Sequence, residues 1–101
     1  MPKTQAFYSE ATLDAAARLG DRLRRARKAQ RRTLADLEQS SRVHRQTLGR
    51  LERGDPSVSF AVVLTVLESL GELADLELLV SQPGEARSVT AIDSEPLPTD
   101  F

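Results

Sequence analysis

The 101-residue chain has no cysteine, one histidine and few aromatic side chains. Without cysteine it can form neither a disulfide scaffold nor a thiolate metal site, and it has no thiol nucleophile. Because His44 is the single histidine, a multi-histidine zinc or iron centre is excluded as well. Aromatic residues make up 4% of the chain and hydrophobic residues 40%, so we expect an aliphatic core. The sequence therefore predicts no metal site and no cofactor.

Long apolar runs are also missing. No stretch approaches the roughly 18 apolar residues that a membrane-spanning helix needs. Residues 1–5 lack the apolar centre of a signal peptide. We also find no nucleophile–base pair, glycine-rich phosphate loop or metal cluster in the sequence. We therefore expect a cytoplasmic protein that is not an enzyme and has no membrane partner.

The charge is distributed unevenly, although the net charge is only −1. Residues 1–53 hold 13 of the 14 Lys and Arg but 6 of the 15 Asp and Glu, which leaves +7. Residues 54–101 hold the remaining basic residue and nine acidic ones, which leaves −8. A basic half indicates contact with nucleic acid. A solvated arginine-rich helix followed by an acidic tail would explain the same charges. The charge distribution alone therefore does not decide between the two interpretations.

Hydrophobic periodicity predicts five helices within about 70 residues. The first helix is expected from Leu13 to about Gln30, with Thr12 as its N-cap. Its apolar positions recur every three or four residues, and basic side chains line the opposite face. The apolar positions are Leu13, Ala16, Leu19, Leu23 and Ala26, and the basic ones are Arg22, Arg25, Lys28 and Arg32.

Two short helices are expected next. Thr33 is a favourable N-cap for the second helix, and Asp36 stands where a capping box has its acid. This helix should end near Ser41. The third helix should begin around His44 and stop at Gly54. The residues expected to face the core are Leu34, Ala35 and Leu37 in the second helix and Val43, Thr47, Leu48 and Leu51 at the third.

The fourth helix, expected from Phe60 to Leu70, is apolar almost all round. Ser59 is its N-cap and Gly71 its stop. A fifth, short helix is expected from Leu73 to Val80. Because the fourth helix carries more apolar surface than one small core needs, it favours a homodimer. Its residues Val62, Leu64 and Val66 would supply either the core or the dimer surface.

The chain divides into three parts by composition. Residues 1–11 are predicted to form an N-terminal arm, residues 12–81 a helical domain and residues 82–101 an acidic, mostly irregular C-terminal tail. A weak alternating run over residues 86–92 favours a short strand in this tail. The predicted fold is an all-α bundle of five helices.

The second and third helices, separated by a turn of about three residues, have the length of a helix-turn-helix. The second helix of such a motif enters the major groove with its N-terminal residues toward the bases. Arg45 and Gln46 stand there, with Arg50 one turn further on, and arginine pairs with guanine and glutamine with adenine. Gly49 removes bulk on the same face. For the phosphates, we expect contacts from Thr33, Arg42, His44, Thr47, Arg53 and the arginines of the first helix.

The segment TLADLEQSSRVHRQTLGRLERG, residues 33–54, closely resembles the helix-turn-helix of the lambda-repressor-like (Xre) family, as does LGDRLRRAR, residues 19–27. The resemblance covers roughly residues 18–80. It implies a five-helix lambda-repressor-like bundle that binds DNA and regulates transcription. It also implies a structural ion pair between Arg27 and Glu52, which would tie the first helix to the third.

A narrower resemblance lies in ERGDPSVSF, residues 52–60, followed by VLESLG, residues 66–71, and LELL, residues 76–79. These stretches are similar to HipB-type antitoxins, which repress their own operon and bind a HipA-type kinase toxin. The resemblance implies a sequence-specific repressor whose partners are a HipA-like kinase toxin and double-stranded DNA. A two-fold symmetric dimer would require a palindromic operator.

Three residues depart from the pattern of the resembled family. Glu38 stands where a small residue is usual, and Leu34 replaces a glutamine that often holds a phosphate. Arg42 replaces a glycine at a turn that often needs positive φ, where a side chain costs about 1 kcal/mol. These departures favour an alternative function, a protein-interaction module whose helix-turn-helix does not read DNA specifically.

Overall fold

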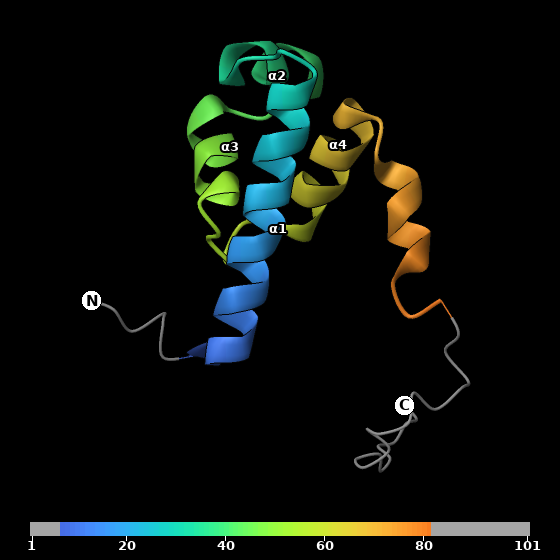
Figure 1. The fold of residues 1–101 in the computed structure, drawn as a ribbon. Helices are drawn as coiled ribbons and strands as arrows, with labels where there is room; N and C mark the ends of the chain where they lie inside the picture. The colour runs from blue at the N-terminus through green and yellow to red at the C-terminus, as the bar shows by residue number, and fades with distance from the viewer. Residues whose placement is uncertain (1–6, 82–101) are drawn as a thin grey trace.

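The computed structural model describes residues 7–81. Its elements are α1 (Glu10–Ala29), α2 (Leu34–Ser41), α3 (Arg45–Glu52), α4 (Phe60–Leu70) and the 3-10 helix η2 (Leu73–Leu78). Over the described residues the fold is all-α, with five helical elements and no strand, which confirms the predicted class (Figure 1). The strand predicted over residues 86–92 lies outside the described residues.

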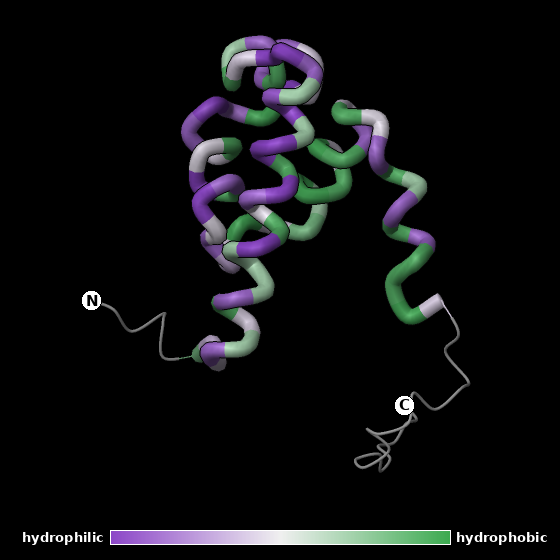
Figure 2. The backbone as a smooth tube through the Cα atoms, in the orientation of Figure 1, coloured by the Kyte–Doolittle hydropathy of each residue, from purple (hydrophilic) through white to green (hydrophobic). Residues whose placement is uncertain are grey.

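The long helix α1 lies against α3 and α4, while α2 packs across both α3 and α4 (Figure 1). The first turns of α1 extend beyond the other helices, and η2 lies beside α4. Apolar residues gather on α4 and η2, whereas α1 and α3 contain mostly hydrophilic residues (Figure 2). The buried core consists of Leu23, Leu37, Leu48, Leu51, Val66, Leu67 and Leu70. None of the helices in the described part of the chain is long and apolar enough to cross a membrane.

Several helix ends follow directly from the sequence. Thr33 and Asp36 form the predicted capping box, since the Thr33 hydroxyl accepts from the Asp36 amide at 3.0 Å and the Asp36 carboxylate accepts from the Thr33 amide at 2.8 Å. Ser59 caps α4 as expected. Gly54 and Gly71 follow α3 and α4 with φ of 88° and 80°, a conformation that favours glycine.

The prediction of Thr12 as the N-cap of the first helix was wrong. The helix begins at Glu10, and the Ser9 hydroxyl accepts from the Thr12 amide at 3.1 Å. Periodicity could not locate this start, because the first residues of α1 are exposed and need no apolar face. The fifth helix is shorter than predicted and of the 3-10 type, ending at Leu78, after which Leu79 is extended and Val80 has a φ of 49°.

The inward face of α2 also differs from the prediction. Leu37 is fully buried and Leu34 is half-buried, but Ala35 is exposed. The third inward residue is Ser41, which is buried, so the inward positions are spaced by three and four residues as on one helical face. Ala35 lies one position off that face.

The turn between α2 and α3 is held by Ser41. Its hydroxyl donates to the Leu37 carbonyl at 2.7 Å and accepts from the Val43 amide at 3.1 Å. Arg42 adopts the left-handed conformation with a φ of 65°, as the sequence led us to expect for this turn. The turn therefore keeps the geometry of a glycine-containing turn, although an arginine occupies the position.

Two glycines allow α1 and α3 to meet backbone to backbone. A Cβ on Gly20 would lie 2.6 Å from the Glu52 carbonyl oxygen and closer still to that of Leu51. A Cβ on Gly54 would lie 2.7 Å from the Cα of Ala17. This close approach fixes the position of α3 relative to α1.

Candidate nucleic-acid interface

Helix α3 carries the residues that the sequence predicted for base contacts. Arg45 and Gln46 lie in its first turn and are exposed, and Arg50 lies one turn further on and is half-buried. Gln46 and Arg50 are four residues apart and therefore share a face of the helix. The three side chains thus lie on one short helix that has its N-terminal turn in solvent.

Arg45 is paired with Glu38 across the turn. Its Nε donates to the Glu38 Oε1 at 3.1 Å. The Arg45 side chain remains 59% exposed and that of Glu38 31% exposed. The sequence showed Glu38 only as a departure from the family pattern. Its pairing with Arg45 was missed, because their separation of seven residues across a turn is set by the packing of α2 on α3.

Arg50 is also paired with a carboxylate. Its Nε donates to Asp55 Oδ2 at 2.9 Å, and its Nη2 donates to the Ser57 hydroxyl at 3.2 Å. Asp55 accepts from both the hydroxyl and the amide of Ser57, at 2.6 and 2.9 Å. Hydrogen bonds from Ser57, together with the Arg50 guanidinium, lower the pKa of Asp55 from 3.8 to about 2. Asp55 is therefore ionised at neutral pH. This contact too was not predicted.

The residues expected to bind phosphate surround α3 without forming one cluster. His44 occupies the N-cap of α3, but its side chain makes no capping hydrogen bond. Arg42 and His44 are exposed in the turn, and Thr47 is half-buried on α3. The Thr33 hydroxyl is exposed at the start of α2, where it caps that helix.

Gly49, which the sequence indicated as removing bulk on the base-reading face, is buried in the structure. The guanidinium of Arg53 lies 3.1 Å from the position that a Cβ of Gly49 would take. The space above Gly49 is therefore covered by a flexible side chain. Arg53 itself is exposed.

Arg27 and Glu52 meet in the buried contact between α1 and α3. Two hydrogen bonds join them, Nε to Oε2 at 2.8 Å and Nη2 to Oε1 at 2.9 Å. Their side chains are only 9% and 8% exposed. The remaining Arg27 nitrogen, Nη1, donates to the Arg32 carbonyl at 2.8 Å. Hydrogen bonding to Glu52 raises the pKa of Arg27 above its ordinary value, so Arg27 keeps its positive charge.

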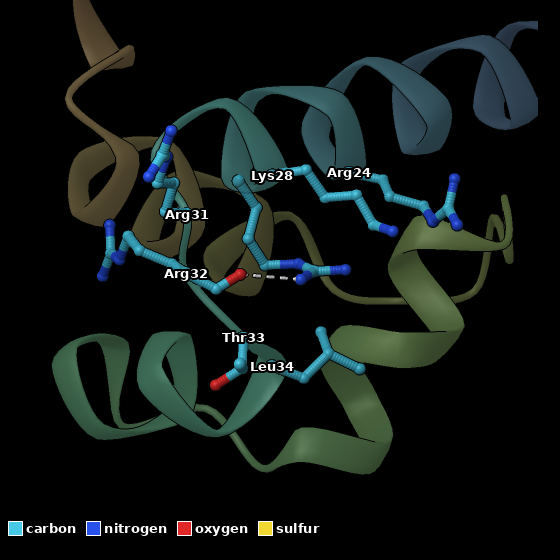
Figure 3. Close-up of a pocket in the computed structure, with 7 residues that line it drawn as sticks. Arg24, Lys28, Arg31, Arg32, Thr33 and Leu34 are labelled. Atoms are coloured by element: carbon cyan, nitrogen blue, oxygen red, sulfur yellow. Dashed lines mark hydrogen bonds between the residues drawn. The ribbon is translucent and has the colours of Figure 1, made fainter.

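An open hollow with a volume of about 570 Å³ lies between the end of α1 and the start of α2 (Figure 3). The Arg27 guanidinium bonds the Arg32 carbonyl there, and the exposed Arg24 and Lys28 extend from α1 alongside it. Basic residues lining one hollow give a surface that attracts anions. The lining residues are Arg24, Arg27, Lys28, Arg31, Arg32, Thr33 and Leu34.

Arg32 differs from the other basic residues of this region because it binds α4. It donates to the Ser69 carbonyl at 2.9 Å and the Ser69 hydroxyl at 3.2 Å, and it also contacts the Ser40 hydroxyl. Gln30 donates to the neighbouring Leu70 carbonyl at 2.8 Å. The two side chains therefore satisfy carbonyls at the end of α4. The sequence grouped Arg32 with the solvated basic face and did not show this role.

No group of three or more His, Asp or Glu side chains among residues 7–81 is placed to hold a metal ion. The charged groups at α3 are instead paired arginines and carboxylates, which suits recognition of a polar or charged macromolecule.

The family model described as a helix-turn-helix domain matches residues 18–79. This range contains the second half of α1 and all of α2, α3, α4 and η2. No curated protein and no solved structure gives a match. The family match and the exposed first turn of α3 agree in indicating a DNA-binding regulator. Because the match covers more than half of the chain, this protein belongs to the helix-turn-helix domain family.

Proposed function

We propose that this protein is a dimeric, sequence-specific transcriptional repressor that binds a palindromic operator in double-stranded DNA. The observation that carries the proposal is the exposed first turn of α3, where Arg45 and Gln46 lie in the position that meets base edges in a helix-turn-helix. Arg50 on the next turn would extend the contact along the groove.

Basic side chains around α3 support contact with the DNA backbone. Arg42, His44 and Arg53 are exposed before and after the helix. The basic hollow at the end of α1 supplies further cations beside Thr33. Phosphate contacts of this kind fix the register of a protein on the duplex without reading its sequence. A role in binding rather than catalysis, in the cytoplasm, accords with this arrangement.

Exposed apolar side chains support the dimer. Leu78, Leu79 and Val80 are 63–71% exposed at the end of η2, and Phe60 is exposed at the start of α4. Exposed apolar residues on a small domain favour association with a second copy. An isologous dimer would present two recognition helices to two half-sites about one helical turn apart.

The test of DNA recognition is fluorescence anisotropy with the duplex just upstream of the reading frame. We expect a preference of roughly 10³-fold or more over a scrambled duplex, as specific DNA-binding proteins show. The double variant R45A/Q46A should lose that preference, whereas K28A should weaken binding to both duplexes alike. Equal binding of the wild type to both duplexes, with steep salt dependence, would overturn the proposal.

We further propose that the protein is the antitoxin of a type II toxin–antitoxin system, which binds a HipA-like kinase toxin and represses their shared operon. Support comes from the similarity of residues 52–60, 66–71 and 76–79 to HipB-type antitoxins. Residues 82–101, with four acidic residues and one arginine, are the proposed contact for the kinase. Full-length protein should retain a HipA-like kinase encoded beside it in a pull-down. Equal retention by a chain ending at Ser81 would rule out the tail as the contact.

The alternative is a protein-interaction module that does not read DNA specifically. The ion pair between Arg45 and Glu38 favours it, because the pair neutralises one predicted base-reading side chain. This alternative predicts weak binding that ignores sequence, with R45A costing no more than K28A. The same anisotropy experiment therefore decides between the two functions.

A further inference from the structure

Both arginines of α3 are held by a carboxylate at the same atom, Nε. Glu38 binds Nε of Arg45 from the helix before the turn, and Asp55 binds Nε of Arg50 from the loop after α3. The two acids come from opposite ends of the recognition helix. These two contacts differ from the other ion pairs in their place, because both arginines lie on the proposed recognition helix.

A contact at Nε leaves the end of the guanidinium for another partner. Arginine has five N–H donors in a planar fork, and only one of them lies on Nε. The hydrogen bonds recorded for Arg45 involve Nε alone, so both Nη groups can reach a guanine. In Arg50 one Nη also contacts Ser57, and the other Nη has no recorded bond.

The two surface pairs contribute little to holding the fold together. Arg45 and Glu38 are 59% and 31% exposed, and exposed ion pairs stabilise proteins weakly because solvent screens them. Their effect on binding is different. A long side chain that is already ordered loses less freedom when it binds, and a nearby negative charge repels phosphates.

We propose that Glu38 and Asp55 are positioning residues for sequence recognition, which orient Arg45 and Arg50 toward base edges and discourage their contact with phosphates. This inference rests on the proposed function as a sequence-specific DNA-binding protein. Each acid lowers affinity for arbitrary DNA while raising discrimination between sequences. Glu38, which departs from the family pattern, is on this account a determinant of specificity.

The experiment is selection from a random duplex library with the full chain, followed by anisotropy on the selected and a scrambled duplex at several salt concentrations. E38Q removes the charge, and E38A removes both the charge and the hydrogen bond. D21N is the matched control. Asp21 pairs with Arg25 on α1 through an exposed contact of 2.9 Å, so this variant also removes one negative charge from a surface arginine.

We expect E38Q and E38A to reduce the preference at one base pair of each half-site by about 5- to 10-fold, within the range that one arginine contact supplies. Their binding to scrambled DNA should become tighter, with the salt slope steeper by about 0.9 as one arginine turns to a phosphate. D55N should relax a different base pair. D21N should leave the selected sequence unchanged.

Two failures can be told apart. If the wild type selects no sequence, the proposed function fails. If the wild type selects a sequence and E38Q and E38A select the same one with equal discrimination, the function stands and Glu38 has no positioning role. Thermal melting of each variant excludes unfolding as the cause, since an exposed pair should leave the melting temperature nearly unchanged.

Discussion

The pair Arg27–Glu52 lies in the buried contact between α1 and α3, whereas the pair Arg45–Glu38 joins α3 to α2 at the surface. Both pairs use an arginine and a glutamate, and both attach the recognition helix to a neighbour. The buried pair has two hydrogen bonds between its side chains and a third to the Arg32 carbonyl. The surface pair has one.

Burial therefore decides what each pair contributes. A buried charge without its partner is strongly unfavourable, so the geometry of the inner pair is held by the fold. An exposed charge can be solvated by water at little cost, so the outer pair adds little to the stability of the fold. The buried pair therefore fixes α3 against α1, and the surface pair holds Arg45 on the exposed side of α3.

The largest expected effect comes from breaking the inner pair. E52Q leaves the Arg27 charge buried without its counter-ion and should lower the free energy of unfolding by about 3–5 kcal/mol. E38Q is the matched variant at the surface and should change it by less than about 1 kcal/mol. Urea denaturation of both variants measures the difference. Equal losses would show that burial does not separate the two pairs.

The backbone contact beside the inner pair gives the next largest effect. G20A places a Cβ against the carbonyl oxygens of Leu51 and Glu52, which should force α1 and α3 apart and cost about 1–3 kcal/mol. G49A is the control, because its Cβ meets only the flexible guanidinium of Arg53. That variant should gain helix propensity and lose little. A G20A protein as stable as G49A in thermal unfolding would contradict the close approach.

A smaller effect, a gain in stability, is expected in the turn between α2 and α3. R42G should stabilise the protein by about 1 kcal/mol, because Arg42 has a φ of 65° that glycine adopts without strain. If Arg42 also contacts phosphate, the same variant should bind scrambled DNA with a salt slope reduced by about 0.9. Chemical denaturation and anisotropy on one protein sample would separate the two effects. A destabilised R42G would show that the turn is not strained.

The smallest effect concerns the acid that holds Arg50. The folded pKa of Asp55 is about 2, below its ordinary value of 3.8, so its stabilising contribution is present above about pH 4. The contribution is lost as the pH falls from about 4 toward 2, because the carboxylate is then protonated. The stability difference between the wild type and D55N should shrink over this range. A difference that stays constant with pH would contradict the contact.

Much of the fold could be predicted from local sequence. The capping box of α2, the Ser59 cap and the two glycine stops depend on residues close together in the chain, and the structure confirms them. The start of α1 could not be located, because Ser9 and Thr12 are both suitable caps and the exposed first turn carries no periodicity. The exposure of Ala35 was missed because neighbouring positions on a short helix differ in burial.

The site was predictable as a set of residues but not as a set of contacts. The sequence placed Arg45, Gln46 and Arg50 on one helix. It did not show that Glu38 and Asp55 bind two of them, since those contacts depend on how α2 and the loop after α3 pack. The network of Arg32 with Ser69 was missed for the same reason, because its partners are 37 residues apart.

The Arg27 guanidinium touches both ends of the helix-turn-helix, the Arg32 carbonyl just before α2 and Glu52 at the last residue of α3. The side chain of Arg27 on α1 thus connects the two ends of the helix-turn-helix. Loss of the Arg27 hydrogen bonds frees both ends together. The helices α2 and α3 should therefore open as one cooperative unit, and their amide protons should exchange with a common free energy of opening. Local unfolding would then open α2 and α3 together and would not unfold the recognition helix α3 alone.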